Sequence, residues 1–444
     1  MASGAELAHA RERRHNSRSG WYWRRLQAMT TAEIGQRVAI ALRHRNDDVA
    51  WRLAQPVWRR SWYPALDGED PQSQAPFLAT GNADELRRAD PDSCARIVER
   101  AEAVLAGRFA FLGYEKTALR RPLDFTLDIA NEFRWPAVHA KRLDYRTAGG
   151  DPKWIWELNR CQHVTLLVAA WLLTAREEFA RCAADDMLEW IRANPPGRGI
   201  AWANGYEAGL RAISLSIAAD ALRDFGALGV DARRTLLLSL WQHRRWIERD
   251  PSLGSSANNH RIGELVGLLA IGVLAPHLPD AGRWRSFALR ALESEADRQI
   301  LPDGGNAEQA FSYSVFVCDL LLVAAALLRQ GGLDRSAAIE AALARAASAF
   351  AAQMSASEPP PRYGDSGGDR AVVLDGEEQR DARRVCAGIT ALTGSPEARL
   401  VASDLDVTAR WLFGEEGARR FAETVPAAPP RSCAFPETGL VVFR

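Results

Sequence analysis

Apolar residues recur at the three- and four-residue spacing of amphipathic helices through most of the chain between Ser93 and Trp411. Short breaks that carry Gly, Pro, Asp or Asn separate these stretches. The clearest helices are expected at residues 156–175, 176–194, 205–225, 231–250, 258–278, 280–300, 308–330 and 334–354. The alternating apolar and polar positions of a half-buried strand do not stand out among them. The pattern therefore predicts an all-α main domain.

Helices with one polar face alternate along the chain with helices that are apolar nearly all round. Residues 180–191 (ARCAADDMLEWI) show the first pattern, and residues 265–274 (LVGLLAIGVL) show the second. A helix that is apolar on every side is buried, whereas a helix with a polar face borders solvent, so the alternation predicts two concentric layers. We expect an incomplete α/α toroid of antiparallel helix pairs, whose connecting loops gather at its two rims.

The pattern changes at both ends and divides the chain into three parts. Residues 1–92 are rich in Arg and Trp without a regular period, and we expect this segment to pack on the toroid of residues 93–425. Residues 426–444 predict a linker and one strand, with no second strand to pair with. Because a lone strand is unstable, we expect it to be the start of a C-terminal β-sandwich domain that is cut off.

Composition and charge argue against several classes of protein. Lys and Arg together number 56, as do Asp and Glu, so no net charge attracts nucleic acid or an anionic membrane. No uninterrupted apolar run predicts membrane insertion, and the N-terminus lacks the apolar core of a signal peptide, so the sequence alone predicts a cytoplasmic protein. The six cysteines form no CxxC pair and no compact set with histidine, so no metal site is expected.

The stretch GSSANNHRIGE, residues 254–264, lies where one helical pattern ends and the next begins. Ser and Asn are favoured N-cap residues, because their side chains accept hydrogen bonds from free N–H groups of the first turn. Capping explains one or two of these residues but not the succession Asn258, Asn259 and His260. A functional role is therefore considered beside the capping role.

Five stretches of the chain occur together in a recognisable order. They are WIWELNRCQHV (154–164), WIRANPPGRGIAWANGYEAGLRAIS (190–214), SSANNHRIGE (255–264), RQILPDGGNAEQAFSYSVFVCDLL (298–321) and RYGDSGGDRAVVL (362–374). Together they resemble the alginate lyase-like N-terminal toroid domain of the heparinase II/III family of polysaccharide lyases, over about residues 100–444. The resemblance implies a toroid followed by a β-sandwich, an acidic polysaccharide as partner, no cofactor, and a periplasmic or secreted location.

The resemblance also implies which residues act. The family cleaves uronate-containing chains by β-elimination, with an Asn-His pair and a Tyr on the toroid and a His from the β domain. The matching positions in this sequence are Asn259, His260 and Tyr313. No histidine follows His277, so the β-domain His has no counterpart, and a missing C-terminal β domain is expected to complete the site.

β-Elimination removes a weakly acidic proton from C5 of a uronate and expels the oxygen on C4. An amide that donates to the uronate carboxylate offsets its charge, which suits Asn259. A phenol with an ordinary pKa of about 10 is a natural proton donor, which suits Tyr313, and His260 can orient the carboxylate or act as the base. Helices two apart in a toroid run parallel, so Asn259 and Tyr313 are expected at the same rim.

Seven further residues in the matched stretches are candidates for substrate binding. They are Asn159, Arg160, Glu207, Asn258, Asn306, Glu308 and Tyr363. Asn159 and Arg160 interrupt an apolar helix, so they either brace neighbouring helices through buried hydrogen bonds or contact a sugar carboxylate, for which Arg offers a bidentate fork. Glu207, Asn306 and Glu308 are expected in rim loops, where they cap helices or bind sugar hydroxyls.

Two other functions remain open at this point. An inverting glycosidase would need two carboxylates about 6.5–9.5 Å apart across a cleft, and Glu207, Asp303 and Glu308 are the candidates. A non-catalytic glycan-binding protein would keep the groove without turnover, and the absent β-domain His favours it. An unsaturated uronate product, which absorbs in the near ultraviolet, distinguishes a lyase from both.

Overall fold

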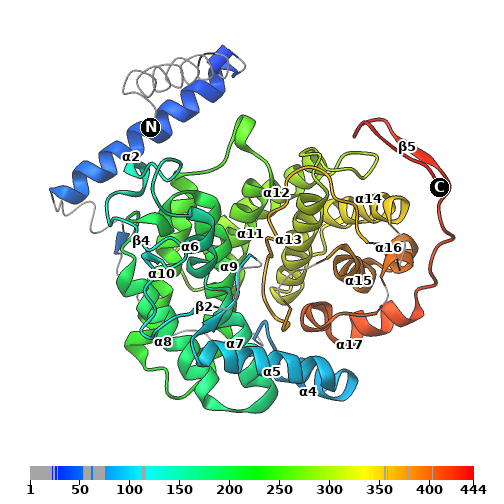
Figure 1. Ribbon diagram of the computed structural model, residues 1–444, viewed down its shortest axis with the longest axis horizontal. Coiled ribbons are helices and arrows are strands. Elements are labelled where there is room, and N and C mark those ends of the chain that lie inside the picture. Colours follow the sequence, from blue (N-terminus) through cyan, green and yellow to red (C-terminus); the bar gives the residue numbers. More distant parts are fainter. Residues whose placement is uncertain are drawn as a thin grey trace, which may run out of the picture.

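The computed structural model describes residues 23, 26–27, 29–53, 62–63, 76–112, 117–354, 357, 359–377, 381–402 and 404–444. This part of the chain is mostly helical (Figure 1). Much of the Arg- and Trp-rich N-terminal segment, including residues 1–22 and 64–75, lies outside the described residues.

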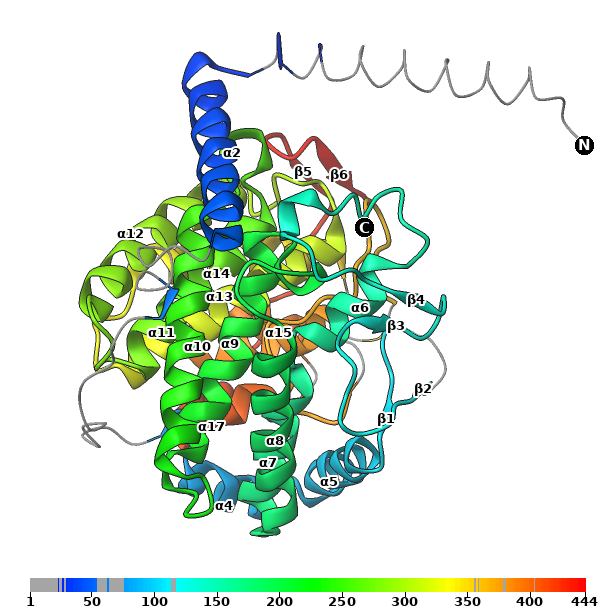
Figure 2. The same cartoon turned by 90° about the vertical axis from the view of Figure 1, so that its left-hand side faces the viewer.

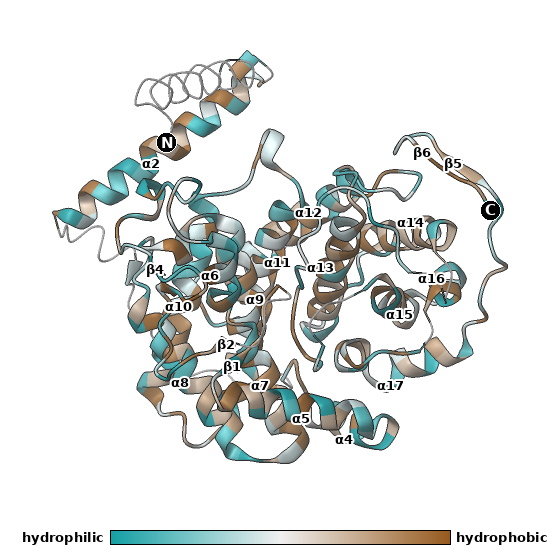
Figure 3. Ribbon diagram, in the orientation of Figure 1, coloured by the Kyte–Doolittle hydropathy of each residue, from teal (hydrophilic) through white to brown (hydrophobic). Residues whose placement is uncertain are grey.

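The helices from residue 162 onward alternate between an inner and an outer layer (Figure 1). The inner helices are α7 (Gln162–Thr174), α9 (Gly205–Ala221), α11 (Asn259–Leu274), α13 (Phe311–Gln330) and α15 (Ala382–Thr393). The outer helices are α8 (Glu177–Ala193), α10 (Val230–Arg249), α12 (Ala281–Gln299), α14 (Ala337–Gln353) and α16 (Pro396–Val401). Each inner helix packs on the next inner helix in sequence. Figure 3 shows the contrast, since α13 is largely hydrophobic and the outer helices carry more polar residues. The predicted all-α toroid is therefore confirmed.

Helices from both ends of the chain join the two ends of the inner layer. α17 (Val407–Glu423) packs on α15 and on α4 (Thr80–Ala89), and both α4 and α5 (Pro91–Leu105) pack on α7. Figure 1 shows these helices along the lower edge of the molecule. The helical body thus includes α4, which precedes the expected boundary at residue 93, and that boundary falls inside α5.

Two inner helices show how the core is packed. By length and composition α13 could cross a membrane, but 83% of its most apolar 18-residue window is buried inside the fold, as in a core helix. α9 and α11 approach closely: a Cβ at Gly209 would lie 2.7 Å from the carbonyl oxygen of Gly263, and a Cβ at Gly267 would lie 2.5 Å from that of Gly209. Glycines at this crossing therefore set the spacing between two helices whose first turns carry candidate site residues.

The helix expected at residues 156–175 is in fact two helices. α6 (Pro152–Asn159) ends before Arg160, and α7 begins at Gln162. Between them Cys161 is fully buried and has a φ of 53°, in the left-handed region that few residues other than Gly adopt. The apolar spacing continues across the break, which is why the sequence predicts a single helix.

The N-terminal segment contains a helix that its irregular pattern does not predict. α2 (Thr31–Arg52) begins after Thr30, whose hydroxyl accepts the backbone N–H of Glu33, and it stands over one side of the toroid (Figure 2). Two short antiparallel hairpins precede α6 along the chain. They are β1 (Arg108–Phe109) with β2 (Thr117–Ala118), and β3 (Leu127–Asp128) with β4 (Phe133–Arg134).

The C-terminal segment forms a hairpin, which corrects the expectation of one unpaired strand. β5 (Cys433–Phe435) and β6 (Leu440–Val442) pair in antiparallel orientation, and Phe435 packs on α14. In the turn, the backbone N–H and the hydroxyl of Thr438 donate to Asp303 at 2.8 and 2.7 Å. The hairpin is thereby attached to the loop that precedes α13.

Candidate active site

The N-terminal ends of α9, α11 and α13 meet at one rim of the toroid. Asn204 caps α9 by accepting the backbone N–H of Glu207 at 2.8 Å, and Asn258 caps α11 by accepting that of His260 at 3.1 Å. Tyr313 lies in the first turn of α13. Because helix N-termini carry partial positive charge, this rim favours anionic groups.

The side chains of Asn258 and Asn259 bind a carboxylate, which belongs to Glu308 in the loop before α13. Asn259 Nδ2 lies 2.9 Å from both carboxylate oxygens, and the Asn259 backbone N–H donates to one of them at 3.0 Å. Asn258 Nδ2 donates to the other at 3.0 Å. Two side-chain amides and one N–H of a helix N-terminus thus form a carboxylate-binding arrangement.

His260 lies beside this arrangement on α11. Its ring stacks on the ring of Tyr206 from α9, with centroids 4.2 Å apart and planes inclined by 13°. Burial lowers the pKa of His260, although the charges of Glu207 and Glu308 act in the opposite direction. The imidazole is therefore neutral at neutral pH and can accept a proton.

Tyr313 is suited to donate a proton. Burial raises the pKa of its phenol, and the negative charges of Asp369, Asp365 and Glu308 raise it further. Since Asp369 and Glu308 also act on the imidazole of His260, the phenol and the imidazole share acidic neighbours. The structure thus brings the predicted residues of α11 and α13 to one place at the rim.

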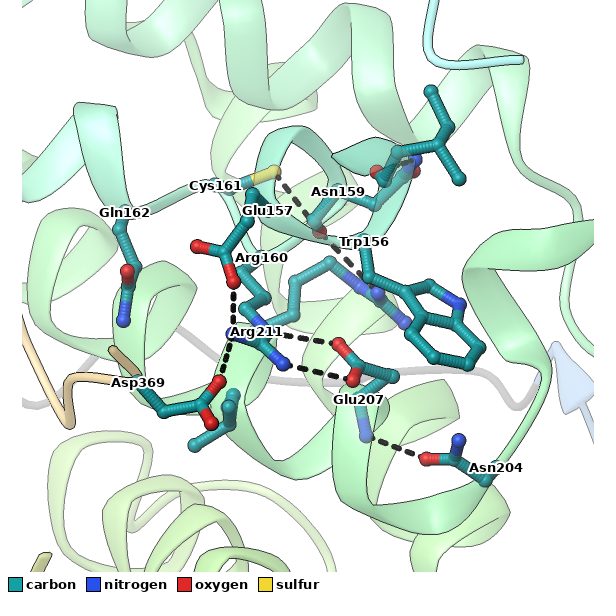
Figure 4. A network of polar contacts seen from close by, with 12 residues as sticks. Trp156, Glu157, Asn159, Arg160, Cys161, Gln162, Asn204, Glu207, Arg211 and Asp369 are labelled. Atoms are coloured by element: carbon teal, nitrogen blue, oxygen red, sulfur yellow. Dashed lines mark hydrogen bonds and ion pairs between the residues drawn. The ribbon is translucent and has the colours of Figure 1, made fainter. Parts of the chain in front are cut away.

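An arginine with three carboxylates lies next to these groups (Figure 4). Arg160 donates from Nε and Nη2 to the two carboxylate oxygens of Glu207, both at 2.9 Å. Its Nη1 donates to Glu157 at 2.5 Å and to Asp369 at 2.6 Å. The guanidinium carbon also lies 5.6 Å from the ring centroid of Tyr206. The cluster therefore connects α6, α9 and the loop between α14 and α15.

Three carboxylates around one guanidinium leave this cluster with an excess of negative charge. Burial raises the pKa of Glu157 to about 7; the charge of Arg160 opposes this effect, and those of Asp369 and Glu207 add to it. Glu157 therefore exchanges a proton near neutral pH. Sequence reasoning missed Glu157, Asp369 and Tyr206, although all three lie within the five stretches that carry the family resemblance.

The structure places Asn159, Arg160 and Glu207 inside the protein, and their contact with substrate stays a prediction. Asn159 is 1% exposed; its amide donates to two backbone carbonyl groups at 2.9 Å, and its oxygen accepts the indole N–H of Trp190. Arg160 and Glu207 are also buried and are paired with each other. These residues brace the rim from inside, which is the structural role considered for Asn159 and Arg160.

The other candidates support the rim or border it. Asn306 is buried, and its side-chain oxygen accepts the backbone N–H of Glu308 at 2.8 Å. Tyr363 donates its hydroxyl to Gln353 at 2.8 Å. Asp303, considered above as a glycosidase carboxylate, instead accepts the two hydrogen bonds from the hairpin turn. Each of the three carboxylates considered for that chemistry is engaged by groups of the protein itself.

Two clefts open beside the rim. The larger, of about 1100 Å³, reaches Asn258 and His260 and is bordered by α2 and residues 139–146. The smaller, of about 430 Å³, reaches Glu157 and residues 366–368. A polymer therefore has room to approach the site from two directions. Within the described residues, no group of three or more His, Cys, Asp and Glu side chains is arranged to hold a metal ion.

Comparison with known proteins places the fold and site in context. A family model described as "Heparinase II/III N-terminus" matches residues 117–378, more than half of the chain. The heparin-sulfate lyase of Pedobacter heparinus is 24% identical over 278 residues, which cover 58% of this chain and 40% of that protein. The chain thus spans less than half the length of this curated relative.

Three solved structures match part of this chain. Heparinase III has 14% identity and a TM-score of 0.49, covering 70% of this chain and 46% of its own. A heparan sulfate lyase from Pedobacter heparinus has 19% identity and a TM-score of 0.48, covering 80% and 51%. An alginate lyase from Bacteroides ovatus has 13% identity and a TM-score of 0.44, covering 80% and 96%. Because the family model extends from β2 past α14, the chain belongs to the heparinase II/III family.

Proposed function

We propose that this chain carries the toroid part of a polysaccharide lyase, which cleaves an acidic glycan at a uronate by β-elimination. The observation that carries the proposal is the carboxylate held by the amides of Asn258 and Asn259. A neutral imidazole at His260 and a protonated phenol at Tyr313 accompany it. The matching heparinase II/III family model and the relative named as a heparin-sulfate lyase support an acidic polysaccharide as the class of substrate.

In this proposal the uronate carboxylate takes the place of the Glu308 carboxylate at the two amides. Hydrogen bonds from Asn259 then offset the charge that develops on the carboxylate when C5 loses its proton. His260 accepts that proton, the C4–O4 bond breaks as the C4–C5 double bond forms, and Tyr313 protonates the departing O4. Each group thus has the protonation state that its role requires at neutral pH.

An inverting glycosidase is less well supported, because it needs one carboxylate free to activate water and another free to protonate the leaving group. Glu207 is paired with Arg160, Glu308 with Asn259, and Asp303 with the hairpin turn. Glu157 has a raised pKa, but it accepts a hydrogen bond from the same Arg160. The arrangement of these carboxylates therefore favours elimination over hydrolysis.

The test is an assay of near-ultraviolet absorbance, which rises as an unsaturated uronate forms, over a panel of acidic polysaccharides that includes heparan sulfate and alginate. Asn259→Ala is expected to lower kcat about 10²- to 10³-fold, as for the loss of one donor to a developing oxyanion. Tyr313→Phe is expected to lower kcat about 10²- to 10⁴-fold, because it removes a general acid.

Tyr63→Phe is the matched control, because it also removes one phenol hydroxyl, and Tyr63 is 45% exposed and lines neither cleft. Its kcat should stay close to that of the parent protein. Parent rates in Asn259→Ala and Tyr313→Phe would remove the proposed roles. Tight binding of a glycan without any unsaturated product would instead favour the non-catalytic binding protein.

A further inference from the structure

α2 is held on the rim mainly through polar contacts next to the candidate site. Glu33 accepts the backbone N–H and the hydroxyl of Ser255 at 3.2 and 2.8 Å, and Arg37 donates to the hydroxyl of Ser256 at 3.0 Å. These serines immediately precede the segment that carries Asn258 and Asn259. The N-terminal helix therefore borders the residues proposed to bind the uronate.

A second set of contacts holds the C-terminal half of α2. His44 Nε2 lies 3.2 Å from Asp250, which also accepts a hydrogen bond from Lys141 at 2.5 Å. Asp47 pairs with Arg249 at 2.5 Å. With the first set, these contacts keep α2 at a fixed distance from the rim and leave a cleft between them.

This cleft is continuous with the candidate site. Its volume of about 1100 Å³ is lined by α2, by residues 139–146 and by residues 250–260, including Asn258 and His260. Pockets that hold one small ligand measure about 300–1000 Å³. The cleft is therefore large enough for several sugar rings that extend from a ring bound at Asn259.

The charges that line the cleft divide into a buried acidic set and an exposed basic set. The carboxylates of Glu33 and Asp250 are each 11% exposed and engaged by the contacts described above. By contrast, Arg142 is 57% exposed, and Arg45 and Arg146 are exposed as well. Within the described part of the chain, no ion pair is found for Arg45 or Arg146. The surface that a ligand meets is therefore cationic.

We propose that this cleft is a binding subsite for further acidic sugars of the same glycan chain, in which Arg45 and Arg146 bind carboxylate or sulfate groups. Guanidinium groups suit such oxyanions, because they donate two parallel hydrogen bonds. α2 forms one side of the cleft and lies outside residues 117–378, the region that the family model matches. The direction in which the sugar chain extends from Asn259 rests on the proposed function. The binding of an anionic ligand in the cleft is independent of that function.

The experiment measures binding by calorimetry with heparin and alginate hexasaccharides and with the corresponding disaccharides. Tyr313→Phe serves as the background, so that turnover does not consume the probe. Replacing Arg45 and Arg146 together by Ala is expected to weaken hexasaccharide binding at least about tenfold and to reduce its salt dependence. Disaccharide affinity should change less than about twofold, because the proposal assigns these arginines to sugars beyond the ring bound at Asn259.

Arg43→Ala is the matched control, since Arg43 is also exposed on α2 but does not line the cleft. The subsite is overturned if the double variant binds hexasaccharides as the background does, if Arg43→Ala has an equal effect, or if no hexasaccharide binds. A selective loss of hexasaccharide binding supports the subsite even if the parent protein produces no unsaturated uronate. In that case only the proposed lyase activity fails, so the two results are distinguishable.

Discussion

Glu157→Gln tests the charge balance of the rim, because it keeps the size of the side chain and removes its ionisable group. In the folded protein the pKa of Glu157 is raised from 4.5 to about 7. The folded state therefore binds this proton more tightly than the unfolded chain. The resulting stability is fully present below about pH 4.5 and is lost as the pH rises through about 7.

The size of the effect follows from the same shift. One pKa unit corresponds to about 1.4 kcal/mol, so ionising Glu157 costs the folded state about 3 kcal/mol relative to the unfolded chain. Gln resembles the protonated form and does not carry this cost. We expect the variant and the parent protein to have similar stability at pH 4.5, and the variant to be more stable by up to about 3 kcal/mol at pH 8.

Urea unfolding followed by circular dichroism at the two pH values measures this difference. Glu177→Gln is the control, because Glu177 is 61% exposed and pairs with Arg181 on the surface. Burial also raises the pKa of Glu264 to about 7, so the pH dependence should decrease in Glu157→Gln rather than disappear. If Glu157→Gln and the parent protein lose the same stability between the two pH values, the reasoning about the cluster is refuted.

Three further predictions concern packing and the site. Gly209→Ala should destabilise the protein by about 1–3 kcal/mol in urea unfolding, because the added Cβ would overlap α11. Gly282→Ala should not change stability, since a Cβ there meets nothing within 4 Å. Equal effects of the two substitutions would contradict the close crossing of α9 and α11. Asn159→Ala should lower the free energy of unfolding by about 1–3 kcal/mol, since it leaves the indole N–H of Trp190 without its acceptor. An increase in KM at unchanged stability would instead support a contact between Asn159 and the substrate. Glu308→Gln should bind acidic oligosaccharides more tightly in calorimetry, because the competing carboxylate is gone; weaker binding would show that Glu308 organises the amides instead.

The layered fold could be predicted because each toroid helix carries its own apolar pattern. The alternation between the helices now seen as α8 and α11 distinguishes a helix with a polar face from one that is buried all round. The shared rim of Asn259 and Tyr313 follows from the same order, since α11 and α13 are consecutive inner helices. These features follow from the apolar pattern of each helix together with simple packing rules, so the sequence is sufficient to predict them.

Other features depend on contacts that local patterns do not encode. The break at Cys161 needs a left-handed backbone at a residue other than Gly, for which the sequence carries no signal. The partners of Arg160 include Glu207 and Asp369, which are 47 and 209 positions away. Local sequence therefore leaves Arg160 open to a sugar contact or to a role in the core, and its carboxylate partners become visible only in the folded chain.

The loop before α13 has two attachments that lie only a few residues apart. At Asp303 it binds the turn of the C-terminal hairpin, and at Glu308 it binds Asn259. The space between loop and hairpin is closed, since a Cβ at Gly305 would lie 1.7 Å from the Thr438 hydroxyl oxygen. One short loop, residues 303–308, thus joins the C-terminal hairpin to the carboxylate that occupies the amides.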